Sequence, residues 1–114
     1  MRYYRLYLQD ILEAMTAIET FIKDMYFAEF EKDDKTSSAV IRKFEIIGEA
    51  TKSIPESIKK KYSKVPWKEM AGMRDKLIHF YFGVNYRLVW QTIHNRLRKV
   101  KPLIEEILNE GNQK

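Results

Sequence analysis

Apolar residues recur every three or four positions in several stretches of the chain, which is the spacing of one face of an α-helix. The first stretch runs from Leu8 to Met25 and predicts one long helix. The second runs from Val40 to Ile54 and predicts a helix that Pro55 stops. Gly48 lies in the middle of the second stretch, where glycine is unfavourable unless another helix approaches closely. No stretch alternates apolar and polar residues as a strand would, so the pattern predicts an all-α protein.

Short segments separate these stretches. Phe27 to Lys32 fits about one helical turn, and the polar residues Asp33 to Ser38 predict a break whose Thr and Ser side chains cap the next helix. Pro55 to Tyr62 predicts a short helix with proline in its first turn. Ser63 to Pro66 is then expected to be a loop.

The C-terminal half predicts two more helices. One runs from Trp67 to about His79, and an interruption follows from Phe82 to Asn85, where Asn85 can cap the last helix. The apolar face of that last helix comprises Val89, Ile93, Leu97, Val100, Ile104 and Ile107. Pro102 lies inside it and should bend the helix near Arg98. We therefore expect one helical-bundle domain over residues 1–114, with about four to five helices.

Composition narrows the classes of function. The chain has 114 residues and no cysteine, which excludes disulfides, iron–sulfur clusters and thiol catalysis and suits a cytoplasmic protein. No stretch approaches the roughly 18 apolar residues of a membrane span, and Met1 to Asp10 does not resemble a signal peptide. A domain this small buries only about two-thirds of its unfolded surface, so pairing with a second subunit would bury more surface and stabilise it. The net charge of +5 is compatible with a nucleic-acid partner.

The segment from Arg74 to Tyr81 carries the clearest candidate chemistry. Asp75 and His79 are four residues apart, so on a helix the carboxylate can accept a hydrogen bond from the imidazole N–H, fix its tautomer and support its charged form. Arg74 and His79 are about 140° apart around an ideal helix, and share a face only if the helix ends near His79. From these residues alone, a solvated Arg–Asp pair, a histidine that caps a helix end and a packed Tyr81 ring are the favoured interpretations.

Arg74, His79 and Tyr81 fit the pattern Arg-x4-His-x-Tyr of the HEPN domain. The chain resembles in particular the HepT toxin branch, and the resemblance covers nearly its whole length. The residues that carry it outside the motif are Ile41 to Ala50, Val65 to Trp67, Tyr81 to Val84, and Val89 with Trp90. Phe80 departs from the pattern, which has a small residue, often glycine, at this position.

The resemblance implies a HEPN helical bundle that forms a two-fold homodimer, with the motifs of both subunits facing one composite cleft. It implies a metal-independent endoribonuclease that needs no cofactor. His79 would act as general acid or base on the RNA, Arg74 would stabilise charge on the phosphorane, and Asp75 would orient His79.

The same resemblance implies how such an enzyme is controlled. It would be the toxin of a toxin–antitoxin pair, neutralised by a minimal nucleotidyltransferase of the MntA type that transfers AMP to the motif tyrosine, here Tyr81. Two alternatives stay open. A non-catalytic HEPN module that binds a nucleotide or a partner enzyme is favoured by Phe80, and a plain helical dimerisation protein is the third interpretation.

Other polar residues are weaker candidates. Arg42 and Lys76 are candidates for RNA phosphate contacts, and so is the basic run Lys59 to Lys61 beside Tyr62. Glu45 and Glu49 form an acidic pair one helical turn apart that could approach the cleft, although such pairs are commonly surface charges. His94, the second of the two histidines, is expected to be solvated or at an interface. The aromatic residues Tyr3, Tyr4 and Tyr7 are expected to make core or dimer contacts.

Overall fold

The computed structural model describes residues 3–77 and 85–110, and the regular structure in this part of the chain is entirely helical, without a strand. Its helices are α1 (Tyr4–Phe21), α2 (Phe27–Lys32), α3 (Asp34–Lys52), α4 (Glu56–Lys61), α5 (Trp67–Leu77), α6 (Tyr86–Thr92), the π-helical turn η1 (Ile93–Leu97) and α7 (Arg98–Glu110). The last three follow one another without a break. The prediction of an all-α fold is confirmed, and the short helices predicted around residues 27–32 and 55–62 are both present.

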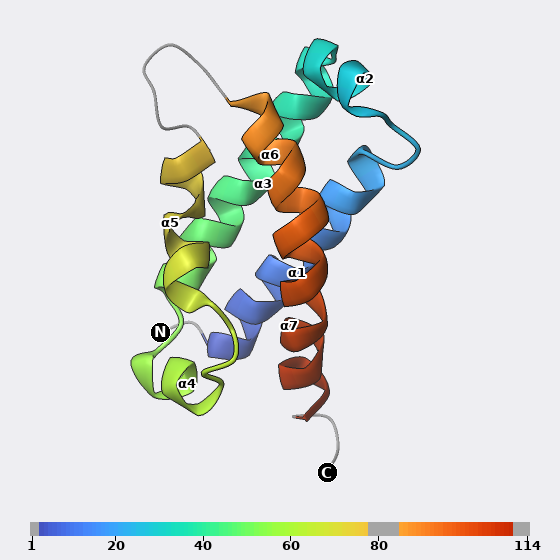
Figure 1. Ribbon diagram of the computed structural model, residues 1–114. Helices are drawn as coiled ribbons and strands as arrows, with labels where there is room; N and C mark the ends of the chain where they lie inside the picture. Colours follow the sequence, from blue (N-terminus) through green and yellow to red (C-terminus); the bar gives the residue numbers. More distant parts are fainter. Residues whose placement is uncertain (1–2, 78–84, 111–114) are drawn as a thin grey trace.

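Helix α3 lies between α1 and α5, and the long C-terminal helix formed by α6, η1 and α7 crosses in front of α1 (Figure 1). The short helices α2 and α4 lie at opposite ends of the bundle. Phe44 and Ile47 on α3 are buried, as are Leu8 and Ile11 on α1 and Met70 on α5. Each such side chain contributes about 1.5–3 kcal/mol by leaving water, so the packing of α1 and α5 against α3 stabilises the bundle.

Two polar contacts fasten α1 to α7. The guanidinium of Arg5 donates hydrogen bonds to the backbone carbonyls of Ile107 and Leu108. Near the other end of α1, Lys101 Nζ lies 2.6 Å from the Glu19 carboxylate. The first and last described helices are therefore joined at both ends.

Helix α1 ends earlier than its apolar pattern predicts. It stops at Phe21, and Ile22 follows with its backbone N–H still bonded to the Ile18 carbonyl. Asp24 then adopts a φ of 63°, the left-handed region that aspartate tolerates better than most residues and that no helix continues through. Met25 still packs against the core, which explains why it fits the apolar stripe although it lies beyond the helix.

The polar segment before α3 is helical from Asp34 onward, so the predicted break over residues 33–38 is wrong. Asp33 is the cap, rather than a Thr or Ser of that segment. Its carboxylate accepts hydrogen bonds from the Thr36 backbone N–H at 3.0 Å and from the Thr36 hydroxyl at 2.8 Å. These bonds favour the ionised carboxylate and lower the pKa of Asp33. The ionised cap satisfies a backbone donor that the first turn leaves open.

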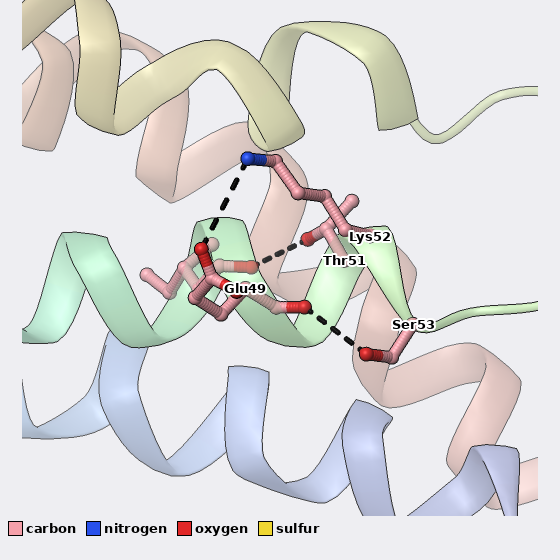
Figure 2. A network of polar contacts seen from close by, with 5 residues as sticks. Glu49, Thr51, Lys52 and Ser53 are labelled. Atoms are coloured by element: carbon pink, nitrogen blue, oxygen red, sulfur yellow. Dashed lines mark hydrogen bonds and ion pairs between the residues drawn. The ribbon is translucent and has the colours of Figure 1, made fainter.

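The other end of α3 is closed by side chains that bond within the helix (Figure 2). The buried Thr51 hydroxyl donates to the Ile47 carbonyl at 2.7 Å, and the Ser53 hydroxyl donates to the Glu49 carbonyl at 3.3 Å. Lys52 Nζ lies 4.0 Å from a Glu49 carboxylate oxygen. The helix thus ends at Lys52, before Pro55, and the polar atom of Thr51 is satisfied although the residue is buried.

The C-terminal helix begins as predicted, because the Asn85 side chain accepts a hydrogen bond from the Leu88 backbone N–H at 3.0 Å. Every residue of its predicted apolar face is buried. The helix widens into the π-helical turn at Ile93–Leu97 and then continues as α-helix through Pro102. The wider turn ends one residue before Arg98, and the bend predicted there from Pro102 stays a prediction.

None of the helices in the described part of the chain is both long enough and apolar enough to cross a bilayer.

Candidate functional site

Helix α5 carries the first half of the predicted motif, and its N-terminal end is firmly anchored. The Trp67 indole N–H donates to the backbone carbonyls of Lys59 and Tyr62, both at 3.1 Å. Met70 and Met73 are buried on the side of α5 that faces the core. The helix is therefore held both by α3 and by the chain that leads out of α4.

The structure places part of the predicted catalytic set. Asp75 and Lys76 are exposed in the last turns of α5, and Arg74 belongs to the same helix, although its side chain is outside the description. His79, Phe80 and Tyr81 lie outside the described residues. The expected Asp75–His79 contact and the roles of Arg74, His79 and Tyr81 stay predictions.

A bidentate ion pair ties α5 to the π-helical turn. Arg96 Nε donates to Glu69 Oε1 at 2.7 Å, and Arg96 Nη2 contacts Glu69 Oε2. The hydrogen bonds from Arg96 are the main reason that the pKa of Glu69 lies below its ordinary value. Arg96 therefore fixes the position of α5 one turn before the predicted motif.

We expect Glu69→Gln to lower the melting temperature at pH 7 by a few degrees. A carboxylate whose pKa is lowered by folding stabilises the protein above its unfolded pKa, near 4.5, and this contribution disappears as the pH falls through the lower folded pKa. The difference between wild type and variant should therefore shrink below pH 4.5. Thermal unfolding followed by circular dichroism across this pH range measures it.

Glu56→Gln is the matched control, because Glu56 is exposed and lies 4.0 Å from Lys59. Its substitution should leave the melting temperature nearly unchanged. A Glu69→Gln deficit that persisted undiminished at pH 3 would show that packing, and not the charge, is responsible.

Arg42 lies on α3, in a small hollow between α1 and α3 rather than beside α5. Asp10, Glu45 and Glu49 line the same hollow. Three carboxylates around one guanidinium compete with RNA phosphate for it, so this hollow is a poor anion site. Arg42 and Lys76 line different hollows, and the RNA contact of Arg42 stays a prediction.

His94 and the N-terminal tyrosines contribute to packing. His94 is half-buried, its Nδ1 lies 2.9 Å from the Trp90 carbonyl oxygen, and its ring centroid lies 4.5 Å from that of Trp90. This geometry shows that His94 is not fully solvated, and the alternative of an interface residue stays a prediction. Tyr4 and Tyr7 pack against the core as predicted, whereas Tyr3 is 58% exposed.

In the folded chain, lysines of the basic run in α4 lie near lysines of α5. Lys59 and Lys60 line a hollow together with Lys68 and Lys76 of α5. The four-residue spacing of Lys68, Gly72 and Lys76 is the signal that could have indicated a shared helix face.

A family model described as "Ribonuclease HepT-like" matches residues 11–107, which include all of α5 and the motif positions. The chain belongs to the HepT-like ribonuclease family. The match extends from the middle of α1 to the last turn of the C-terminal helix, so it covers most of the bundle that positions α5.

Relatives with similar lengths support this assignment. A protein of Methanocaldococcus jannaschii named "Putative RNase MJ0127" is 52% identical over 106 residues, covering 93% of this chain and 88% of the relative. A protein of Thermococcus cleftensis named "Probable ribonuclease HepT" is 47% identical over 106 residues, covering 93% and 96%. A protein of Caldanaerobacter subterraneus named "Putative RNase TTE0752" is 46% identical over 110 residues, covering 96% and 98%. No solved structure matches the chain.

Proposed function

We propose that this HepT-like protein is a metal-independent endoribonuclease and the toxin of a toxin–antitoxin pair. The observation that carries the proposal is the presence of Arg74, Asp75 and His79, spaced as in the HEPN pattern, in a chain whose family is named for a ribonuclease. Curated relatives with RNase names over nearly their full length add support.

The chemistry needs only groups that RNA and this chain supply. The ribose 2′-hydroxyl loses its proton to one His79 and attacks the adjacent phosphorus, forming a new P–O bond. The bond from phosphorus to the 5′-oxygen breaks, and that oxygen takes a proton from a second imidazole. The products are a 2′,3′-cyclic phosphate and a 5′-hydroxyl. Arg74 stabilises the extra charge on the phosphorane, and Asp75 orients His79.

The need for one imidazole that accepts a proton and a second that donates one favours the proposed homodimer. A single His79 can act either as the base or as the acid at a given moment. A two-fold composite cleft would supply two His79 side chains, one for each role. The proposed partner is a minimal nucleotidyltransferase of the MntA type, which would neutralise the toxin by placing AMP on Tyr81. The alternative of a non-catalytic binding module is favoured by the bulky Phe80, and it predicts partner binding without any cleavage.

We expect the purified protein to cleave RNA at an undiminished rate after dialysis against EDTA. Because the nucleophile and both proton-transfer groups are already present, removing divalent ions should not affect the chemistry. Gel analysis of labelled RNA, with mapping of 2′,3′-cyclic phosphate ends, provides the measurement. Activity that vanished in EDTA and returned with Mg²⁺ would contradict the metal-independent mechanism.

A further inference from the structure

The hollow between α4 and α5, here called the lysine groove, is lined by Lys59 and Lys60 of α4 and by Lys68, Gly72 and Lys76 of α5. Val65, Pro66 and Trp67 line it where the chain passes from one helix to the other. Its volume is about 1070 Å³, compared with about 240 Å³ for the hollow around Arg42. The groove is thus large enough for a polymer to lie in it.

The charge of the groove is positive. Among the described residues that line it, four are lysines and two are glutamates, and both glutamates already face a cation. Glu69 is held by Arg96, and Glu56 lies 4.0 Å from Lys59. Lys60, Lys68 and Lys76 form no ion pair within the described ranges, although the charge of Lys76 helps to lower the pKa of Glu69. Lys60 and Lys68 in particular can therefore meet an anion from outside.

Gly72 keeps the middle of the groove open. No atom of the described residues lies within 4 Å of the position where a Cβ would stand at Gly72. Glycine inside a helix is unfavourable by about 1 kcal/mol relative to alanine, and here no neighbouring element of the described structure uses the space. Lys68 and Lys76 lie one turn before and one turn after it on the same face. The arrangement leaves a gap with a lysine at each end.

We infer that the lysine groove binds the phosphate backbone of a single RNA strand. The inference rests on the proposed ribonuclease function for its choice of anion. A second copy of this chain fits less well, because two basic grooves facing each other across a two-fold axis repel. Lys68 and Lys76 are two turns apart, about 12 Å along α5, so they suit two phosphates that are not adjacent on one strand.

Arg74 and the groove lie on different sides of α5, because Arg74 is about 200° from Gly72 around an ideal helix. Lys60 and Lys68 precede the motif in the sequence, whereas Lys76 lies within it, three residues before His79. Substitutions of Lys60 and Lys68 should therefore raise KM and leave kcat at saturating RNA unchanged.

The first test measures binding of a fluorescent single-stranded RNA by anisotropy, in a His79→Ala background that prevents cleavage. Lys68→Gln combined with Lys76→Gln should weaken binding about tenfold and reduce the salt slope by about 1.4, because two phosphate contacts are lost. Lys32→Gln combined with Lys52→Gln removes the same charge from exposed sites elsewhere. This control should change the affinity by less than about twofold.

The second test uses a matched pair at Gly72. Gly72→Glu and Gly72→Gln add side chains of the same size to the open space, and only the first adds a negative charge. The Glu variant should bind RNA several-fold more weakly than the Gln variant, and circular dichroism should show equal helical content. Equal affinities of the two variants would contradict a phosphate site at this position.

Cleavage assays with His79 intact separate the two proposals. If the lysine double variant binds RNA as tightly as wild type while the wild type cleaves RNA, the groove inference fails and the ribonuclease function stands. If the wild type binds RNA through these lysines without cleaving it, the ribonuclease proposal fails instead. A change in sedimentation with unchanged RNA affinity would assign the groove to subunit contacts and overturn the inference.

Discussion

Replacing His79 by alanine should reduce RNA cleavage by about 10²–10⁴-fold, the contribution of a positioned general acid or base. The imidazole is the group in the proposed mechanism whose ordinary pKa lets it both accept and donate a proton near neutral pH. The loss should appear in the rate at saturating RNA, because RNA binding depends on cationic side chains instead. Single-turnover cleavage of labelled RNA measures it.

His94→Gln is the control, since it removes the chain's other histidine, which packs against Trp90 on the C-terminal helix. Cleavage by this variant should stay close to wild type at a temperature where it is folded. Sedimentation and circular dichroism should show the His79→Ala protein with wild-type assembly and helical content. Cleavage that survived the loss of His79 would exclude the proposed mechanism.

AMP on Tyr81 should suppress cleavage as completely as loss of His79. The tyrosine oxygen would attack the α-phosphorus of ATP, pyrophosphate would leave, and the hydroxyl proton would pass to solvent or a base of the partner. The adduct adds about one negative charge and a nucleotide's volume two residues beyond His79. An incoming RNA backbone would then meet both charge repulsion and a steric block.

Incubation with a minimal nucleotidyltransferase and ATP, followed by peptide mass spectrometry, should place the adduct on Tyr81. Tyr81→Phe should remain active in the presence of that partner. Tyr26→Phe is the matched control, because Tyr26 is 78% exposed and would be modified if exposure alone decided the site. A Tyr81→Phe toxin that the partner still neutralised would show that control acts through binding or through another residue.

The apolar pattern predicted which segments are helical but not where each helix ends. The core positions from Val89 to Ile107 are all buried as predicted, because burial follows the helical period directly. The end of α1 depends on the left-handed backbone of Asp24, and the start of α3 depends on Asp33 rather than on nearby Thr and Ser residues. Several residues in each segment could cap a helix equally well, and the tertiary structure selects one.

The sequence predicted which residues carry the candidate site, but only some of the residues that lie around it. The motif spacing located Arg74 and Asp75 on a helix, which α5 confirms. The lysine groove could not be predicted, because it exists only where the Trp67 indole holds the end of α4 beside α5. The separation of Lys60 and Lys76 along the sequence does not predict that the two residues line the same hollow.

The pairing of α1 with α7 also determines when the protein can complete its fold during synthesis. The ribosome makes α1 first, yet the carbonyls that bind Arg5 belong to Ile107 and Leu108. Until those residues emerge, part of the apolar face of α1 has no partner and is open to chaperones and proteases. A chain that stops before residue 98 lacks α7, so we expect it to expose that face of α1 and to be degraded more readily than the folded protein.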